Sequence, residues 1–353
     1  MKILLEQITQ KRNELKTDNY VITWNELITM YKDNTLNISP QFQRMFRWSI
    51  EQQSVFIESI LLGIPIPPIF LFEEKDSTKT VIDGLQRVST VIKFFSNEST
   101  PSQKKVDSND VAVPPVLTRG RIIESLEGQT PMSLPVELIR AIKYSRIPVI
   151  ELERDTNEEV RYEVFIRLNR QGTDLTDQEL RNCAVRLASN EFADSLIELA
   201  NDPIVNEALK FSPKMRSGMY VEELILRSLA MAYDVKSYEG SLTDFLDKFM
   251  LKATNRKELL PSGWKDRILI MFKLVSETIG SKAFKRNGVF SPGLFEIVSV
   301  GAFLKLNQKN IRLLQPAWKE LIDSKELSDC IGSGSNAKAK VLKRYNLAIG
   351  LLS

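Results

Sequence analysis

VIDGLQRVSTVIKFF, residues 81–95, is the stretch of this sequence that decides the fold. Its first residues end a short β-forming run, and STVIKFF continues with the apolar spacing of an amphipathic helix. Between the two lies a compact polar cluster, DGLQR. Because an Asp-Gly pair favours a turn, the pattern predicts a strand that passes directly into a helix.

A helix that begins straight after a strand exposes backbone N–H groups, which attract anions and above all phosphate. Gly84 lets a ligand approach the backbone closely, and Arg87 can hold phosphate oxygens in a bidentate way. Ser89 and Thr90 can donate to phosphate or hold a Mg²⁺-bound water. The alternative is a plain strand-to-helix turn with a solvated arginine, because short glycine motifs have many false positives.

Two further polar side chains complete this cluster. Asp83 can bind a metal ion, accept from a sugar hydroxyl or cap the helix. Gln86 can position a water molecule.

Strands are predicted on both sides of a KDST turn, because IFLF and TKTVID are short, apolar and bounded by turn residues. The prolines of IPIPPIFLF forbid a helix there. A third strand is expected over RIPVIELE, residues 146–153. Residues 96–118 lack periodicity and are expected to form a surface loop or an insertion.

Helix starts are marked by capping residues at Thr23, Ser49 and Thr176, and Glu179 completes a capping box with Thr176. Further helices are expected over residues 1–16 and 156–171. Beyond residue 190 nearly all patterns are helical, with helices expected at 191–209, 219–234, 242–253, 263–279, 291–306, 309–323 and 337–352.

The sequence therefore predicts an α+β protein with two domains. Residues 1–190 form an α+β domain with few strands, and residues 191–353 form a helical domain.

Histidine is absent from all 353 residues. This excludes Ser-His-Asp and Cys-His catalysis, His-ligated metal centres and nuclease centres built around a catalytic histidine. The two cysteines suggest neither a disulfide framework nor zinc spacing. A net charge of +3 means that any nucleic-acid contact depends on local basic clusters. We find no signal peptide and no apolar run of about 18 residues, so we expect a cytoplasmic protein without a membrane partner.

Two more polar clusters lie on either side of the central turn. QFQRMFRW, residues 41–48, places Arg44 and Arg47 among aromatic residues. It is typical either of a phosphate or nucleic-acid surface or of solvated arginines beside buried rings. RLNRQGTDLTDQELRNC, residues 167–183, surrounds a helix–turn–helix corner, where the capping box explains most of the pattern without a ligand.

Four stretches, in this order and spacing, resemble the N-terminal domain of GmrSD-type restriction endonucleases. They are QRMFRWS at 43–49, SILLGIPIPPIFLF at 59–72, IDGLQRVST at 82–90 and FIRLNRQGTDLTDQELRN at 165–182. The resemblance covers roughly residues 20–190. It implies a ParB/sulfiredoxin-like fold with a small mixed sheet, followed in this chain by a mostly α-helical region.

In that family the DGQQR turn is the nucleotide-binding and NTPase motif, in proteins that defend bacteria against foreign or modified DNA. The resemblance implies that the matching residues here bind a nucleoside triphosphate of unknown base, with Mg²⁺ and without a dedicated protein metal site. Those residues are Asp83, Gly84, Gln86, Arg87, Ser89 and Thr90, with Arg44 and Arg47 in second rank. Asp83 and Gln86 would be the catalytic residues.

This chain departs from the family pattern in two ways. Many members carry a His-dependent nuclease domain of the HNH type, which a chain without histidine cannot hold, so DNA cutting would need a partner. In addition, DGQQR is DGLQR here. At the place of Leu85, ParB-type proteins carry Glu and sulfiredoxin carries its reactive Cys. Leucine can replace neither, so sulfiredoxin chemistry is not expected. Leu85 either keeps the attacking water out or simply fills a core position.

Two functions remain open from the sequence. The first is a nucleotide-binding, NTP-hydrolysing subunit of a bacterial restriction or anti-phage system, acting with a partner nuclease or ATPase. The second is a non-enzymatic DNA- or protein-binding module that keeps only the fold. DNA contact is expected to be weak and salt-sensitive, and homo-oligomerisation stays open. The cations expected to contact DNA are Arg44, Arg47, Lys282, Lys285, Arg286, Lys340, Lys343 and Arg344.

Overall fold

The computed structural model describes residues 2–38, 48–96, 115–170, 175–256, 259–305 and 311–351. Internal contacts divide the chain into two compact units, Met1–Asn169 and Arg170–Ser353. We call them the sheet unit and the helical unit and describe each by itself. Together they give an α+β protein with an N-terminal mixed sheet and a mostly helical C-terminal region, as the sequence predicts.

A five-stranded mixed sheet forms the centre of the sheet unit, in the strand order β1-β5-β3-β4-β2. Strand β5 pairs antiparallel with β1 and parallel with β3, whereas β4 pairs antiparallel with β3 and parallel with β2. The strands run over Thr17–Thr23 (β1), Leu36–Asn37 (β2), Ile69–Glu73 (β3), Lys79–Asp83 (β4) and Arg146–Leu152 (β5).

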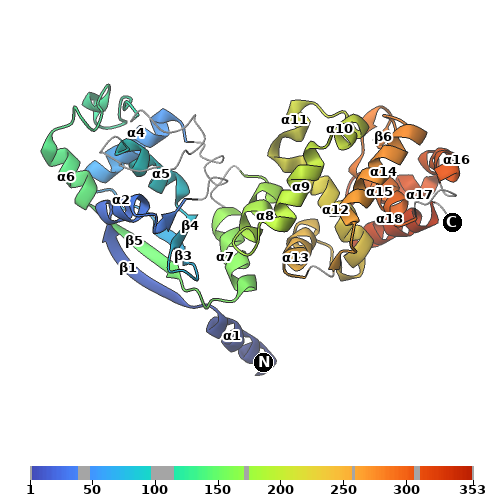
Figure 1. Cartoon of the computed structure of the whole chain (residues 1–353), viewed down its shortest axis with the longest axis horizontal. Coiled ribbons are helices and arrows are strands. Elements are labelled where there is room, and N and C mark those ends of the chain that lie inside the picture. The colour runs from blue at the N-terminus through green and yellow to red at the C-terminus, as the bar shows by residue number, and fades with distance from the viewer. Residues whose placement is uncertain are drawn as a thin grey trace. The chain divides into compact units, whose positions relative to one another are not determined.

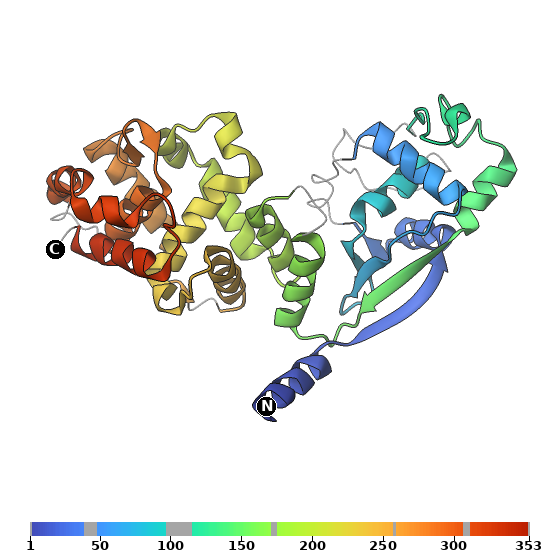
Figure 2. The same cartoon turned by 180° about the vertical axis from the view of Figure 1, so that it is seen from behind.

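Helices α2, α4, α5 and α6 lie along one face of this sheet and bury the core of the unit against it (Figures 1 and 2). Alternate strand residues such as Ile69 and Leu71 point into this core. Phe72 points to the opposite face, where Arg161 of α7 stacks on its ring. The helices of the unit are Lys2–Glu14 (α1), Trp24–Lys32 (α2), Ile50–Leu61 (α4), Leu85–Phe94 (α5), Val136–Tyr144 (α6) and Glu158–Arg170 (α7).

The predicted helix starts are confirmed. Thr23 and Ser49 each form a reciprocal capping box, with Glu26 and Gln52 respectively. Strands β3, β4 and β5 also form where expected. Strand β1 was not predicted, because at the edge of the sheet its residues are largely exposed and show little apolar alternation. The expected loop at 96–118 falls mostly on residues 97–114, outside the described residues.

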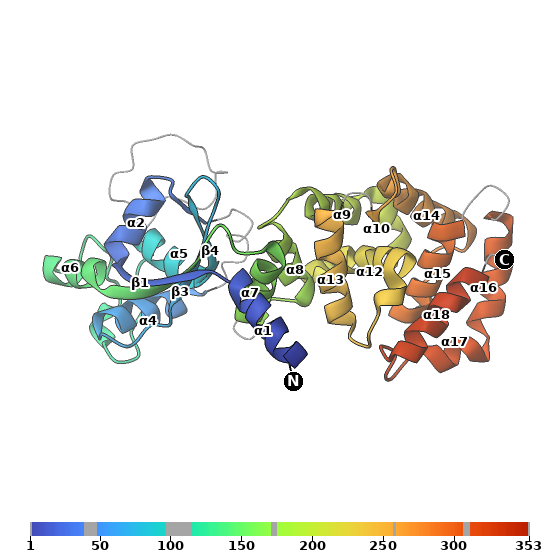
Figure 3. The same cartoon turned by 90° about the horizontal axis from the view of Figure 1, so that it is seen from below.

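The helical unit is built around α12, which packs against α9, α13 and α15 (Figure 3). Its longer helices lie where expected, and the capping box of Thr176 with Glu179 is confirmed. The helices are Asp177–Val185 (α8), Glu191–Asn201 (α9), Pro203–Leu209 (α10), Pro213–Arg216 (α11), Tyr220–Asp234 (α12), Leu242–Asn255 (α13), Trp264–Thr278 (α14), Pro292–Lys305 (α15), Ile311–Ile322 (α16), Lys325–Cys330 (α17) and Lys338–Gly350 (α18).

The single helix expected over 191–209 is wrong. Helix α9 ends at Asn201, and Asp202 caps a new helix whose first residue is Pro203. Proline has no N–H for the preceding helix and suits a first helical position, so the break is local chemistry that the periodicity concealed. A hairpin of two short strands, Lys285–Arg286 (β6) and Val289–Phe290 (β7), was also not predicted.

Candidate functional site

The central turn has the predicted strand-to-helix geometry. Strand β4 ends at Asp83, Gly84 takes the left-handed conformation with φ 91°, and α5 begins at Leu85. The N-cap residue of this helix, Gly84, has no side chain to cap it, and no capping hydrogen bond from a side chain is seen among the described residues. The first helical hydrogen bond runs from Val88 N to Gly84 O, at 2.9 Å, so the amides before Val88 lie outside the hydrogen-bond ladder of the helix. Backbone amides at a helix N-terminus favour anions.

Gly84 is required by the geometry of this turn as well as by its φ. A Cβ atom at this position would lie 2.5 Å from Ile69 Cδ1 and 3.1 Å from Arg87 Nη2. Any larger residue would therefore force the side chain of Ile69 to move and would crowd the guanidinium of Arg87.

Arg87 joins the turn to the proline-rich segment before β3. Its Nη2 pairs with Asp83 Oδ2 at 2.9 Å, and its Nη1 donates to the carbonyl oxygens of Pro67 and Pro68. Burial lowers the pKa of the guanidinium, and Asp83 opposes that shift. An arginine still remains charged at neutral pH. In this structure Arg87 is thus a half-buried structural cation rather than a solvated side chain.

Gln86 joins the turn to the second predicted cluster. Its Oε1 accepts a hydrogen bond from the backbone N–H of Trp48 at 3.3 Å. Trp48 in turn packs edge-on against Phe56 of α4, with ring centroids 5.5 Å apart. Arg44 and Arg47, the cationic members of that cluster, lie outside the described residues.

The third predicted cluster reaches the same turn through Asn169, the penultimate residue of α7. Its Nδ2 donates to Ile82 O at 3.1 Å and to Phe165 O at 3.0 Å. The pairing of β4 with β3 shifts by one residue at this point, because Phe70 pairs with Asp83 whereas Leu71 pairs with Val81. Ile82 is therefore the extra residue of a β-bulge, and the Asn169 amide satisfies its carbonyl.

Ser89 and Thr90 are both buried, with 6% and 1% of their surface exposed. Thr90 Oγ1 donates to Gln86 O at 2.7 Å. Of the side chains predicted for the nucleotide site, the described ones that reach the surface are Asp83, Gln86 and Arg87. Leu85 is half-buried and packs against the core of the sheet unit, which favours its reading as a core residue.

The rest of the third cluster has a structural role. Arg181 is 1% exposed and pairs with Asp247 at 2.7 Å and with Glu223 at 3.2 Å. Both partners come from distant parts of the sequence. Gly172, expected to end the preceding helix, lies outside the described residues.

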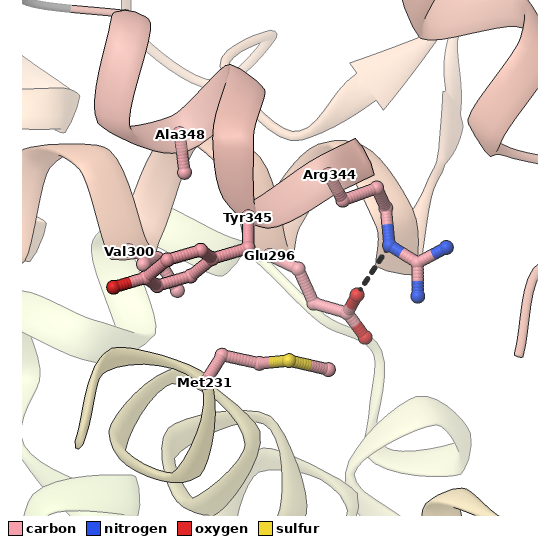
Figure 4. A pocket seen from close by; sticks show the side chains of 6 residues that line it. All are labelled: Met231, Glu296, Val300, Arg344, Tyr345 and Ala348. Atoms are coloured by element: carbon pink, nitrogen blue, oxygen red, sulfur yellow. Dashed lines mark hydrogen bonds and ion pairs between the residues drawn. The ribbon is translucent and has the colours of Figure 1, made fainter. Parts of the chain in front are cut away.

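The cations expected to contact DNA do not all reach the surface. Arg344 is 3% exposed and pairs with Glu296 at 2.6 Å in the core of the helical unit (Figure 4). The DNA contact predicted for Arg344 is therefore wrong, because its side chain is buried and pairs with an internal carboxylate. Lys343 pairs with Asp329 at 3.1 Å. Lys285 and Arg286 form strand β6 of the hairpin.

Among the described residues no group of three or more His, Cys, Asp or Glu side chains is placed to hold a metal ion. Within the same ranges of the chain, no helix is both long and apolar enough to cross a membrane.

The sheet and its turn define the class of this protein, which is an α+β domain with a mixed sheet. Strand β4 of this sheet leads through a glycine turn into α5, and three distant segments of the chain bind this turn. Within that class, residues 25–186 match the family described as GmrSD restriction endonuclease, N-terminal domain. This part of the chain is a domain of that family, which confirms the resemblance seen in the sequence. No curated protein matches the chain.

Proposed function

We propose that the sheet unit binds the phosphates of a nucleoside triphosphate, with Mg²⁺, at residues 83–87, and that it does so as a subunit of a bacterial DNA restriction system. The observation that carries the proposal is the convergence of four separate motifs on one uncapped helix start. Pro67, Trp48 and Asn169 all anchor this short turn, and its amides are the anion-binding group.

The side chains of the turn have distinct roles in this proposal. The amides from Leu85 onward receive phosphate oxygens. Arg87 exchanges its pairing with Asp83 for a phosphate oxygen, a charge-assisted contact of the same kind. That exchange releases the Asp83 carboxylate toward Mg²⁺, whose preferred ligands are oxygens. Gln86, the residue predicted to orient a water molecule, has its Oε1 bonded to Trp48 N.

Turnover is slow in this proposal. Hydrolysis needs a polar group that orients or deprotonates the attacking water. Leu85 has no hydrogen-bonding side-chain atom and packs on the core. Gln86 Oε1 already accepts from Trp48 N. The domain therefore acts as a nucleotide-gated switch more than as a fast NTPase. In this proposal the chain acts with a partner nuclease or ATPase, any DNA cutting is the work of a partner nuclease, and contact of this chain with DNA is weak and salt-dependent.

Calorimetric titration with ATP, GTP and CTP, each with Mg²⁺, tests the site. Removing a charge-assisted contact should cost about 1.5–3 kcal/mol, so Arg87→Ala should bind roughly ten- to a hundredfold more weakly. The matched control is Arg161→Ala, which removes another half-buried arginine of the same unit, stacked on Phe72. Equal affinity in Arg87→Ala and wild type would contradict the proposal.

The second candidate is a non-enzymatic DNA- or protein-binding module. One observation favours it: the bonds of Arg87 to Asp83 and to two proline carbonyls account for the Asp-Gly turn without any ligand. In that case none of the three nucleotides binds, and none raises the melting temperature, since only a ligand that binds the native state can stabilise it.

A further inference from the structure

Asn169 and Arg170 are neighbours in the chain, and each is bonded inside its own unit. Asn169 donates to Ile82 O, one residue before Asp83, in the sheet unit. Arg170 pairs with Asp247 at 2.9 Å and with Asp177 at 3.5 Å, in the helical unit. One peptide bond therefore separates a contact with the candidate nucleotide turn from a contact with the helical core.

The Asn169 contact is sensitive to the turn for a geometric reason. Ile82 is the extra residue of the β-bulge and has no paired residue on β3. Ile82 is 4% exposed and Asn169 8%, so loss of this hydrogen bond would remove a partner from a buried carbonyl, which is costly. A shift of Ile82 and Asp83 must therefore be followed by Asn169.

The Arg170 contact leads into a continuous series of ion pairs. Arg170 pairs with Asp247, Asp247 with Arg181, and Arg181 with Glu223. The series continues to Arg227, Glu296 and Arg344, across helices α7, α13, α8, α12, α15 and α18 in turn. The N···O distances are 2.9, 2.7, 3.2, 2.6, 3.6 and 2.6 Å in the same order.

This series is buried along most of its length. Arg181, Asp247, Glu296 and Arg344 are each less than a tenth exposed. Removing one partner of a buried ion pair leaves an uncompensated buried charge, which strongly destabilises the folded state. Such a series therefore has discrete arrangements and does not deform gradually. Figure 4 shows its far end, where Arg344 meets Glu296 beside Tyr345 and Met231.

We propose that α7 couples the 83–87 turn to the packing of the helical unit, with Asn169 following the Ile82 carbonyl and Arg170 passing the change to Asp247 and the ion-pair series. The proposal rests on the proposed function for its natural trigger, since a nucleotide that takes over Arg87 and Asp83 would move the turn. It assigns a regulatory output to that site.

The first test needs no nucleotide. Hydrogen exchange followed by mass spectrometry compares wild type with Arg87→Ala, which perturbs the turn, and reads the amides of α8 and α13. We expect exchange there to change about fivefold or more, the lower end of ordinary coupling between sites. Arg170→Gln should abolish that response. The control is Arg167→Ala on the same helix, whose exposed side chain pairs only locally with Glu163 in the described contacts.

If Arg87→Ala unfolds the sheet unit, Arg87→Lys replaces it, since it keeps the charge but loses the fork of donors. The coupling would be overturned if hydrogen exchange in α8 and α13 were the same in wild type and the Arg87 variant. It would also be overturned if the Arg87 variant changed that exchange equally when Arg170→Gln is present.

The second test adds ATP, GTP or CTP with Mg²⁺ to the same full-length proteins. Nucleotide binding in calorimetry with altered α8 and α13 exchange, lost in Arg170→Gln, supports both proposals. Binding without any change in exchange overturns the coupling and leaves the nucleotide site standing. Coupling in the first test without binding of any nucleotide overturns the proposed function and leaves the coupling standing.

Discussion

Gly84→Ala should destabilise the sheet unit more than any ordinary glycine substitution. Gly84 has φ 91°, where a non-glycine residue costs of order 1–3 kcal/mol. The new Cβ would also lie 2.5 Å from Ile69 Cδ1, and overpacking of this kind costs typically about 1–3 kcal/mol more. Alanine also lowers the conformational entropy of the unfolded chain, which offsets about 0.4–1 kcal/mol of this loss of stability. The expected net loss is therefore roughly 1–6 kcal/mol.

Gly128→Ala separates the two contributions. Gly128 also has a positive φ, 78°, but its added Cβ would meet nothing within 4 Å. It carries the backbone cost alone, so the difference between the two variants measures the close approach of Ile69 to the turn, about 1–3 kcal/mol.

The assay is hydrogen exchange across a urea series, read on peptides that cover β4 and α5. Reading one unit at a time matters because a chain of two units need not unfold in a single step. If Gly84→Ala is no more destabilising than Gly128→Ala, the tight packing of Ile69 against the turn is wrong, and with it the argument that only glycine fits there.

Three further predictions concern other parts of the chain. Glu58 is buried and accepts from three backbone N–H groups, those of residues 121–123; burial raises its pKa, but the donors outweigh burial and leave the pKa lowered. Its contribution to stability is thus present above the ordinary pKa of 4.5 and is lost as the pH falls through the lower folded pKa, so acid titration of the melting temperature should fall more steeply in wild type than in Glu58→Gln. If the hairpin contacts DNA, Lys285→Gln should reduce the log–log salt slope of binding by about 0.9, and an unchanged slope would exclude that residue. Leu85→Gln should raise the phosphate-release rate if Leu85 keeps water out; brisk hydrolysis by wild type, unaltered in Leu85→Gln, would make Leu85 purely structural and end the switch idea.

The features that the sequence predicted are those set by neighbouring residues. Capping boxes depend on residues three apart, so Thr23, Ser49 and Thr176 could be assigned from letters alone. Strands β3 and β4 could be assigned because prolines and a turn isolate them. The Asp-Gly turn followed the same rule, since its conformation is decided by Gly84 itself.

The features that could not be predicted depend on contacts between distant segments. Arg87 reads as a solvated cation in the sequence, yet it donates to the carbonyl oxygens of Pro67 and Pro68, twenty and nineteen residues earlier. The bulge at Ile82 has no sequence signal, because it arises from the register of β4 against β3. The surface role expected of Arg344 failed for the same reason: Glu296, its partner, lies 48 residues away.

The contacts that fix the central turn in the fold are also the contacts that would preorganise it for the proposed phosphate. An Asp-Gly pair by itself is enough to turn a strand into a helix. Here the turn is also fixed by Arg87 on the proline carbonyls, by Gln86 on Trp48 and by Asn169 on Ile82. Each of these contacts reduces the freedom of the backbone amides at the start of α5. Amides that are fixed before a ligand arrives bind an anion without a further ordering cost, which is the advantage of a preorganised site. Each anchor also stabilises the fold by itself, so the calorimetric comparison of wild type with Arg87→Ala is the measurement that separates a phosphate site from a turn that serves folding alone.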